Sequence, residues 1–273
     1  MAAEPVIVAI AAVFGSLLGS FLNVCVYRLP RHESVVRPRS RCPKCGTLVA
    51  WYDNVPVLSW LALRGKCRHC GARITIQYPL VEAAVAAIWA LAVCRLGVTA
   101  GALSTALFLT LLLGILLTDA QHYIIPDELS LGGLAAGLVL AFVTPIGIVR
   151  AVIGAAAGFL LLWAVKAAGD VALQKGWIGG REVQETLGAQ EPVSAMGGGD
   201  IKMLAMVGAF LGWQGALASV FLGALLGTIV FLPFLFRAKK PLVPFGIFLA
   251  LGAAAWLVTG GRLADWYARV VAI

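Results

Sequence analysis

The chain is a succession of long apolar stretches separated by short polar segments. About eight stretches of roughly 20 mostly apolar residues can be placed, and each is long enough for a helix that crosses a bilayer. They begin near residues 5, 79, 101, 129, 148, 203, 217 and 243. This pattern predicts an all-α polytopic membrane protein with about eight transmembrane helices.

One region is short for the helices it must hold. Positions 203–236 leave about 25 Å for each of two crossings at the helical rise of roughly 1.5 Å per residue. We predict two short helices that meet around Gly212-Trp213-Gln214-Gly215, because one long helix would place Arg237, Lys239 and Lys240 outside, against the positive-inside rule. The first apolar run, residues 6–26, has no basic leader or small-residue cleavage site, so we expect a retained anchor.

Composition supports the membrane assignment. Hydrophobic residues make up 61% of the chain, charged residues only 12%, and the mean hydropathy is +0.94. An ordinary soluble domain is thereby excluded.

The positive charge is concentrated in one segment. Residues 28–78 contain ten Lys or Arg against Glu33 and Asp53: Arg28, Arg31, Arg37, Arg39, Arg41, Lys44, Arg64, Lys66, Arg68 and Arg73. Because Lys/Arg-rich loops stay in the cytoplasm, we predict a first transmembrane helix at 1–27, a cytosolic insert at 28–78 and a membrane core at 79–273. The excess of basic residues is thus explained by membrane topology, and we expect no nucleic-acid partner. Membrane lipids are the expected surroundings.

The insert carries a strong metal-binding signal. Cys42-Pro43-Lys44-Cys45 and Cys67-Arg68-His69-Cys70 are two C-x-x-C knuckles, a spacing typical of a zinc ribbon. We predict that Cys42, Cys45, Cys67 and Cys70 bind one zinc ion. Four thiolates close the coordination shell, so the zinc is expected to be structural. Two disulfides are the alternative, disfavoured in a reducing compartment, and His69 is a competing ligand or a solvated loop residue.

Two carboxylates flank the apolar runs. Asp119 ends one run and Asp200, within Gly197-Gly198-Gly199-Asp200, begins another, and the predicted topology returns both to one membrane face. Acids at such positions often line a pathway or site. Two carboxylates sharing a water would hold one protonated and one ionised form, as an aspartic hydrolase requires. Helix capping is the alternative role, especially for Asp200.

Several motifs together resemble the bacterial type IV prepilin peptidases, membrane aspartic proteases of the Gly-x-Gly-Asp type. The resemblance covers nearly the whole chain. The motifs are Gly19-Ser20-Phe21-Leu22-Asn23-Val24, Tyr27-Arg28-Leu29-Pro30, the two cysteine pairs, Ser59-Trp60-Leu61, Gly65-Lys66-Cys67, Tyr78-Pro79-Leu80-Val81-Glu82, the segment from Asp119 to Asp127, and the segment from Gly197 to Lys202.

The resemblance implies a bifunctional enzyme of the bacterial inner membrane. Such an enzyme removes the leader of type IV prepilins or type II secretion pseudopilins on the cytoplasmic side, with Asp119 and Asp200 as catalytic residues. It then N-methylates the new N-terminus with S-adenosylmethionine. The family associates the cysteine-bearing insert with this bifunctional form.

Four further features keep two interpretations each. Asp127 follows Pro126 and suits a helix N-cap better than catalysis. Lys202 pairs with a carboxylate or phospholipid, or snorkels. Glu82 is a structural hydrogen-bonding acid or belongs to the methyltransferase site, which no glycine-rich loop marks. The segment 169–199 is expected to be a mobile loop that is either simply flexible or acts as a lid or substrate guide. In the second case Glu182, Glu185 and Glu191 would attract the basic leader.

Other functions remain open from the residues alone. A metal-dependent membrane hydrolase would bind its ion with Asp119, His122 and Asp200, since Asp119 and His122 share a helix face if that stretch is helical. A membrane-anchored zinc ribbon acting as an assembly scaffold, or a transporter whose acids carry protons, are the non-enzymatic alternatives.

Overall fold

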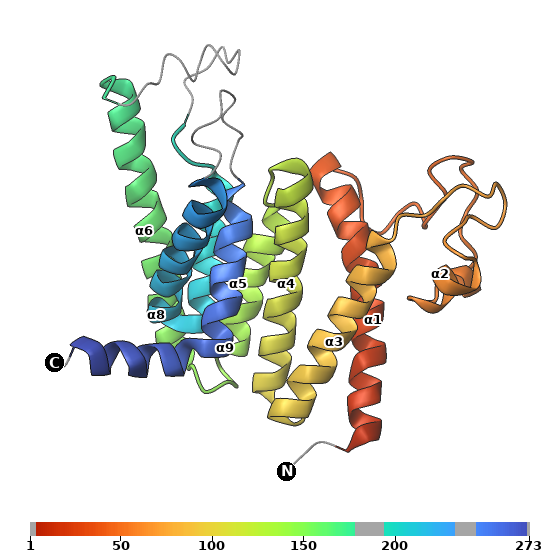
Figure 1. Cartoon of the computed structure of the whole chain (residues 1–273), viewed down its shortest axis with the longest axis horizontal. Helices are drawn as coiled ribbons and strands as arrows, with labels where there is room; N and C mark the ends of the chain where they lie inside the picture. Colours follow the sequence, from red (N-terminus) through yellow and green to blue (C-terminus); the bar gives the residue numbers. More distant parts are fainter. Residues whose placement is uncertain (1–3, 178–193, 233–243, 272–273) are drawn as a thin grey trace. The chain divides into compact units, whose positions relative to one another are not determined.

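The structure, a computed structural model, describes residues 4–177, 194–232 and 244–271, with side chains to residue 260 (Figure 1). Outside the insert, the described residues are mostly helical. The chain forms two compact units, one ending at His122 and one beginning at Tyr123. In chain order the elements are α1 (Pro5–Arg28), η1 (Leu29–Arg31), η2 (Trp51–Asn54), α2 (Leu58–Ala62), α3 (Gln77–Leu96), α4 (Ala100–His122), α5 (Asp127–Leu140), α6 (Ile148–Gln174), α8 (Gly198–Phe231) and α9 (Phe245–Val271).

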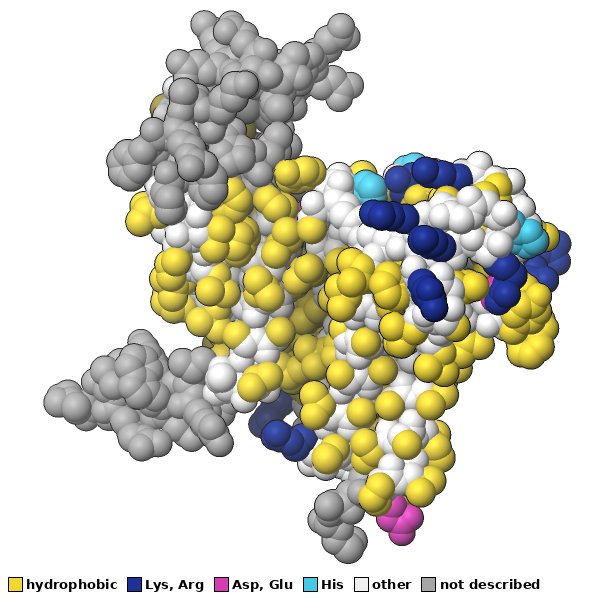
Figure 2. Space-filling view, turned by 45° about the vertical axis from the view of Figure 1, so that its right-hand side comes forward, with side chains coloured by type: hydrophobic (Ala, Val, Ile, Leu, Met, Phe, Trp, Pro, Cys, Tyr) yellow, Lys and Arg dark blue, Asp and Glu magenta, His cyan; other side chains and the backbone are white. Residues whose placement is uncertain are grey.

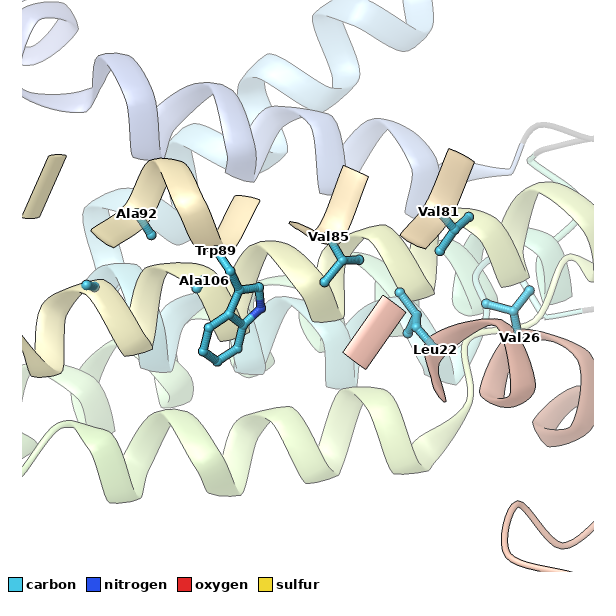
Figure 3. Close-up of a cluster of buried hydrophobic side chains, with 8 residues drawn as sticks. Leu22, Val26, Val81, Val85, Trp89, Ala92 and Ala106 are labelled. Atoms are coloured by element: carbon cyan, nitrogen blue, oxygen red, sulfur yellow. The ribbon is translucent and has the colours of Figure 1, made fainter. Parts of the chain in front are cut away.

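The first unit is built on α1, α3 and α4, with the insert between α1 and α3. Figure 3 shows its core, where Leu22 and Val26 of α1 meet the row of buried side chains Val81, Val85 and Trp89 along α3. The helices approach closely because α1 carries glycine at the contact. A Cβ on Gly19 would lie 2.8 Å from the Glu82 Cα, so no larger residue fits there without a shift.

In the second unit, α8 packs against α5, α6 and α9. Backbones come together where α6 meets α8, since a Cβ on Gly154 would lie 2.2 Å from the Gly208 carbonyl oxygen. In the second half of α8, a Cβ on Gly223 would lie 2.8 Å from the carbonyl oxygen of Phe248 in α9. Gly208 and Gly223 begin two small-residue motifs, Gly208-x-x-x-Gly212 and Gly223-x-x-x-Gly227, and both glycines make these close contacts within the chain.

Helix α8 is broken, as the sequence predicts. Gly212 has φ 74° and ψ 177°, a conformation outside the helical region that glycine adopts without steric cost. The break divides α8 into two helices at the predicted Gly212-Trp213-Gln214-Gly215 segment. Each of the eight predicted stretches thus coincides with a helix or a half of α8.

Five of the described helices are long and apolar enough to cross a membrane: α1, α3, α4, α6 and α8. Helix α5 is shorter, and the apolar part of α9 spans Phe245–Gly260. Hydrophobic side chains cover much of the surface in Figure 2, as lipid-facing helices require. The predicted class, an all-α polytopic membrane protein with a small zinc-ribbon-like insert, is confirmed. The predicted loop at 169–199 is partly wrong, because α6 continues to Gln174.

Candidate functional site

Asp119 lies in the last turn of α4. Asp119 is only 5% exposed, although the helix ends three residues later at His122. The preceding Thr118 is fully buried and donates its hydroxyl to the carbonyl oxygens of Gly114 and Ile115, so this turn is packed on its polar side as well. A carboxylate held in a buried helical turn has a defined direction, which a catalytic acid needs.

Asp200 lies at the start of α8. The helix begins at Gly198 with Gly197 as its N-cap, so Asp200 is a first-turn acid and not the N-cap that was the alternative interpretation. A carboxylate in the first turn is stabilised by the free N–H groups and the dipole of the helix. Gly197, Gly198 and Gly199 carry no side chains, so no Cβ covers the backbone immediately before Asp200.

The glycine before Asp200 makes a close contact. A Cβ on Gly199 would lie 2.8 Å from the Cβ of Ile125, whereas a Cβ on Gly198 would meet nothing within 4 Å. Ile125 belongs to the segment that leads from α4 into α5. The first turn of α8 therefore rests directly on that segment.

A second contact joins the same two segments. The Lys202 ammonium donates to both carboxylate oxygens of Asp127, at 2.7 and 2.8 Å. Asp127 is the first residue of α5 and Pro126 is its N-cap, so the predicted N-cap role of Asp127 is wrong by one position. Of the two roles proposed for Lys202, the structure shows pairing with a carboxylate. The pair was missed because the partners are 75 residues apart and nothing local marks them.

Asp119 belongs to the first compact unit and Asp200 to the second. The pairing of the two aspartates therefore stays a prediction. One condition of the alternative metal site is met. Helix α4 continues through His122, so Asp119 and His122, three residues apart, lie on the same face of the helix.

The four insert cysteines do come together. Their sulfur atoms all lie within 4.8 Å of one another, and Cys42 Sγ is 3.9 Å from Cys70 Sγ. The two knuckles repeat one geometry. The N–H groups of Gly46 and Gly71 donate to the carbonyl oxygens of Cys42 and Cys67, and both glycines have positive φ, +71° and +68°.

These distances fit a zinc ion. A tetrahedral shell with Zn–S bonds of about 2.3 Å places its sulfurs about 3.8 Å apart. All six cysteines are free thiols, and a 3.9 Å separation is far beyond a disulfide bond of about 2.05 Å, so the disulfide alternative is wrong. His69 lies outside the cluster.

The knuckles favour the thiolate at two of the four cysteines, Cys45 and Cys67. Hydrogen bonds from the Thr47 side chain and backbone lower the pKa of Cys45 to about 6. Backbone N–H groups of Cys70 and His69 lower the pKa of Cys67. The backbone hydrogen bond from Ala72 is outweighed at Cys70, where burial and hydrogen bonds with the other cysteine side chains instead raise the pKa to about 11. Deprotonated sulfur is the form that binds zinc.

Glu82 connects α3 to the insert. Its side chain is 7% exposed, and its Oε2 accepts a 2.7 Å hydrogen bond from the N–H of Val57. Val57 caps α2 with φ 61°, which is unfavourable for a β-branched residue. This contact supports the structural interpretation of Glu82.

The described residues just before α8 are held to α6 through Asp170, which lies within that helix. Asp170 accepts hydrogen bonds from Lys166 at 2.6 Å and from the N–H of Ala195 at 2.7 Å. Glu182, Glu185 and Glu191, expected to guide a basic leader, lie outside the described residues.

Two families of known proteins match the chain. The Bacterial Peptidase A24 N-terminal domain matches residues 13–96, which hold α1, the insert and α3. The Type IV leader peptidase family matches residues 106–232, which include Asp119 and Asp200. No solved structure matches the chain.

Curated relatives named "Prepilin leader peptidase/N-methyltransferase" are similar over most of the chain. The Myxococcus xanthus protein is 37% identical over 80% of this chain, which spans 60% of that relative's length. The Burkholderia pseudomallei protein is 36% identical and the match covers 92% of this chain and 85% of the relative. The Aeromonas salmonicida protein is 33% identical, with coverage of 94% and 92%.

Proposed function

The chain belongs to the type IV prepilin leader peptidase/N-methyltransferase family, and from this premise we propose that Asp119 and Asp200 are its catalytic dyad. The proposed substrates are type IV prepilins or type II secretion pseudopilins, which the enzyme cleaves after their leader. The observation that carries the assignment to residues is the buried carboxylate in the last turn of α4, together with the first-turn carboxylate that follows three glycines in α8.

The proposed hydrolysis uses the two carboxylates in complementary states. The ionised carboxylate takes a proton from water while the water oxygen attacks the carbonyl carbon of the scissile peptide. The protonated carboxylate donates to the carbonyl oxygen. Collapse of the tetrahedral intermediate then breaks the C–N bond, and the nitrogen leaves with a proton as the new N-terminus.

Methyl transfer is the proposed second reaction. S-adenosylmethionine is the proposed methyl donor, in line with the N-methyltransferase in the names of the relatives. The new amine attacks the methyl group of the sulfonium, the C–S bond breaks, and the nitrogen loses a proton. Cleavage must come first because the amine that accepts the methyl group is the product of hydrolysis.

The zinc has a separate, structural role in this proposal. Cys42, Cys45, Cys67 and Cys70 would hold one ion and fold the insert, which has little hydrophobic core of its own. Four cysteine ligands leave no position for a catalytic water.

The proposed location is the bacterial inner membrane with the active site facing the cytoplasm. The insert's ten basic residues against two acids support a cytoplasmic position for the segment between α1 and α3. The ends of α4 and the start of α8 then face the same side if the intervening helices cross the membrane as the sequence predicts.

The test is cleavage of a purified prepilin by detergent-solubilised enzyme, with products weighed by mass spectrometry. Wild type is expected to remove the leader and, with S-adenosylmethionine, to add one methyl mass. Asp119→Asn and Asp200→Asn are each expected to lower cleavage by about a thousandfold or more. Glu128→Gln is the control, since Glu128 is an exposed acid next to Asp127. Cleavage by either aspartate variant near the wild-type rate would refute the dyad.

The same assay separates the metal-dependent alternative. If Asp119, His122 and Asp200 bound a catalytic ion, His122→Ala and a chelator would both abolish cleavage while the insert kept its zinc. A mechanism that uses only the two aspartates requires neither loss of cleavage in His122→Ala nor loss of cleavage with a chelator.

A further inference from the structure

The insert presents a row of exposed apolar side chains between η2 and the end of α2. Trp51 is 76% exposed, Leu58 65% and Leu61 58%. We call this surface the apolar face, made of Trp51, Tyr52, Val55, Leu58 and Leu61. Side chains of this size grouped on one exposed surface mark an interaction site.

The apolar face is continuous. The rings of Trp51 and Tyr52 pack edge to face with centroids 5.7 Å apart. Tyr52, Val55 and Leu58 line one shallow pocket of about 230 Å³, and Leu61 follows Leu58 by three positions on α2.

The other side of the same segment is anchored to the insert. Ser59 is buried and donates its hydroxyl to the Tyr52 carbonyl oxygen at 2.9 Å. The Trp60 ring nitrogen donates to the Ile74 carbonyl oxygen at 3.2 Å. Helix α2 is therefore held with Leu58 and Leu61 outward.

Contacts with α3 and α1 show that the segment from Trp51 to Leu61 lies level with the ends of these two transmembrane helices and not beyond them. Val57 hydrogen-bonds Glu82, the sixth residue of α3, which lies about 7 Å inside that helix at 1.5 Å per residue. Trp51 shares a pocket of about 400 Å³ with Phe21, which lies about 10 Å before the end of α1. Figure 1 shows α2 beside α1 and α3 and not beyond their ends.

The surrounding charge is positive. Every basic residue of the insert except Arg28 is exposed, and Arg28 instead donates to the carbonyl oxygens of Ser34 and Pro38. In Figure 2 the Lys and Arg side chains gather on this part of the molecule, next to hydrophobic side chains. Such clusters beside a transmembrane helix attract anionic lipid headgroups.

We propose that the apolar face is inserted into the interfacial region of the anionic membrane leaflet beside α1 and α3. Trp51 and Tyr52 occupy the headgroup level, where aromatic rings with a polar atom are stable, and Leu58 and Leu61 reach the acyl chains. The Arg68 guanidinium, which lies over the Tyr52 ring at the edge of the apolar face, contacts the phosphates. A basic prepilin leader is disfavoured as the occupant, since the insert carries the same sign of charge.

Photocrosslinking in lipid nanodiscs tests this. Leu61 is replaced by the photoreactive amino acid p-benzoylphenylalanine in the full chain, and adducts are weighed after illumination. Lys44, exposed within the first knuckle, receives the same replacement as the control. About one zinc ion per chain shows that each variant has a folded insert.

We expect about tenfold more phospholipid adduct at position 61 than at position 44, and more in discs with phosphatidylglycerol than in discs of phosphatidylcholine alone. Equal lipid adduct at both positions would overturn membrane insertion. A predominantly protein adduct at position 61 would also overturn it, in favour of a protein partner. Equal yields of lipid adduct in the two kinds of disc would overturn the proposed preference for an anionic leaflet. The readout does not depend on peptidase activity.

Discussion

The Lys202 ammonium donates to both carboxylate oxygens of Asp127 and joins the first turn of α5 to the second turn of α8. Lys202 is two residues after Asp200, and Asp127 is eight residues after Asp119. Beside this pair, Gly199 rests against Ile125. Two contacts thus hold the segment just before α5 against the start of α8, so we propose that Lys202 and Asp127 position Asp200 for the proposed catalysis.

The pair is expected to matter more for catalysis than for stability. Its side chains are 36% and 56% exposed, and such ion pairs contribute only about 0–1 kcal/mol to the free energy of unfolding. A small displacement of a catalytic group, by contrast, costs up to about a hundredfold in rate. Lys202→Met is therefore expected to lower kcat for prepilin cleavage by about tenfold or more, with a Tm close to wild type.

The double variant distinguishes pairing from separate roles. If Lys202 acts through Asp127, Asp127→Asn should have a similar effect, and the double variant should lose little more than either single one. Multiplicative losses, or cleavage within about twofold of wild type in both single variants, would contradict the positioning role.

Gly199 and Gly198 offer a matched comparison. The new methyl group of Gly199→Ala would meet the Ile125 Cβ at 2.8 Å, while that of Gly198→Ala would meet nothing within 4 Å. Overpacking of this kind costs about 1–3 kcal/mol or is relieved by a shift of the contact. We expect Gly199→Ala to lose about tenfold or more in cleavage rate and Gly198→Ala to remain near wild type.

A second substitution, at Ile125, tests whether the contact with Ile125 causes the loss of activity in Gly199→Ala. Ile125→Ala removes the side-chain atoms beyond the Cβ and gives the segment freedom to move, so we expect it to restore part of the activity lost in Gly199→Ala. Equal losses in Gly199→Ala and Gly198→Ala would show that the contact with Ile125 is not the reason.

Much of this fold follows from local sequence signals. Apolar length predicts the helices, and Gly212 lies within the short segment where the chain was expected to break. The cysteine knuckles were found because both ligands of a pair are only three positions apart. Nothing comparable marks Lys202 and Asp127 as partners, since helix packing alone brings them together. The role of Asp127 was misassigned because the cap and the first helical residue are only one position apart, and aspartate is favourable both at the cap and in the first turn.

Zinc removal is expected to unfold the insert. Structural zinc contributes about 10–16 kcal/mol of apparent binding free energy in small zinc domains, and the described part of the insert has only isolated bridges and short helical turns besides. Cys70→Ser is expected to lower the bound zinc from about one ion per chain to near zero. It should also raise hydrogen exchange across residues 41–74.

Cys94→Ser is the control, because Cys94 is an exposed thiol of α3 outside the cluster. Its zinc content and its hydrogen exchange should match wild type. Retention of zinc by Cys70→Ser together with the wild-type exchange pattern would contradict the four-cysteine site.

The hydrogen bond between Glu82 and Val57 leads to a prediction about the whole insert. Glu82 is almost fully buried, and its oxygen satisfies a backbone N–H held at an unfavourable positive φ. Glu82→Gln keeps an oxygen acceptor at the same place, whereas Glu82→Leu leaves the Val57 N–H without its partner. An unsatisfied buried group costs about 1–3 kcal/mol. Hydrogen exchange of residues 55–62 in lipid nanodiscs should therefore rise by about tenfold or more in Glu82→Leu and stay near wild type in Glu82→Gln. If instead both variants kept wild-type exchange and lost only methyl transfer, Glu82 would belong to the methyltransferase site and the anchoring role would be wrong.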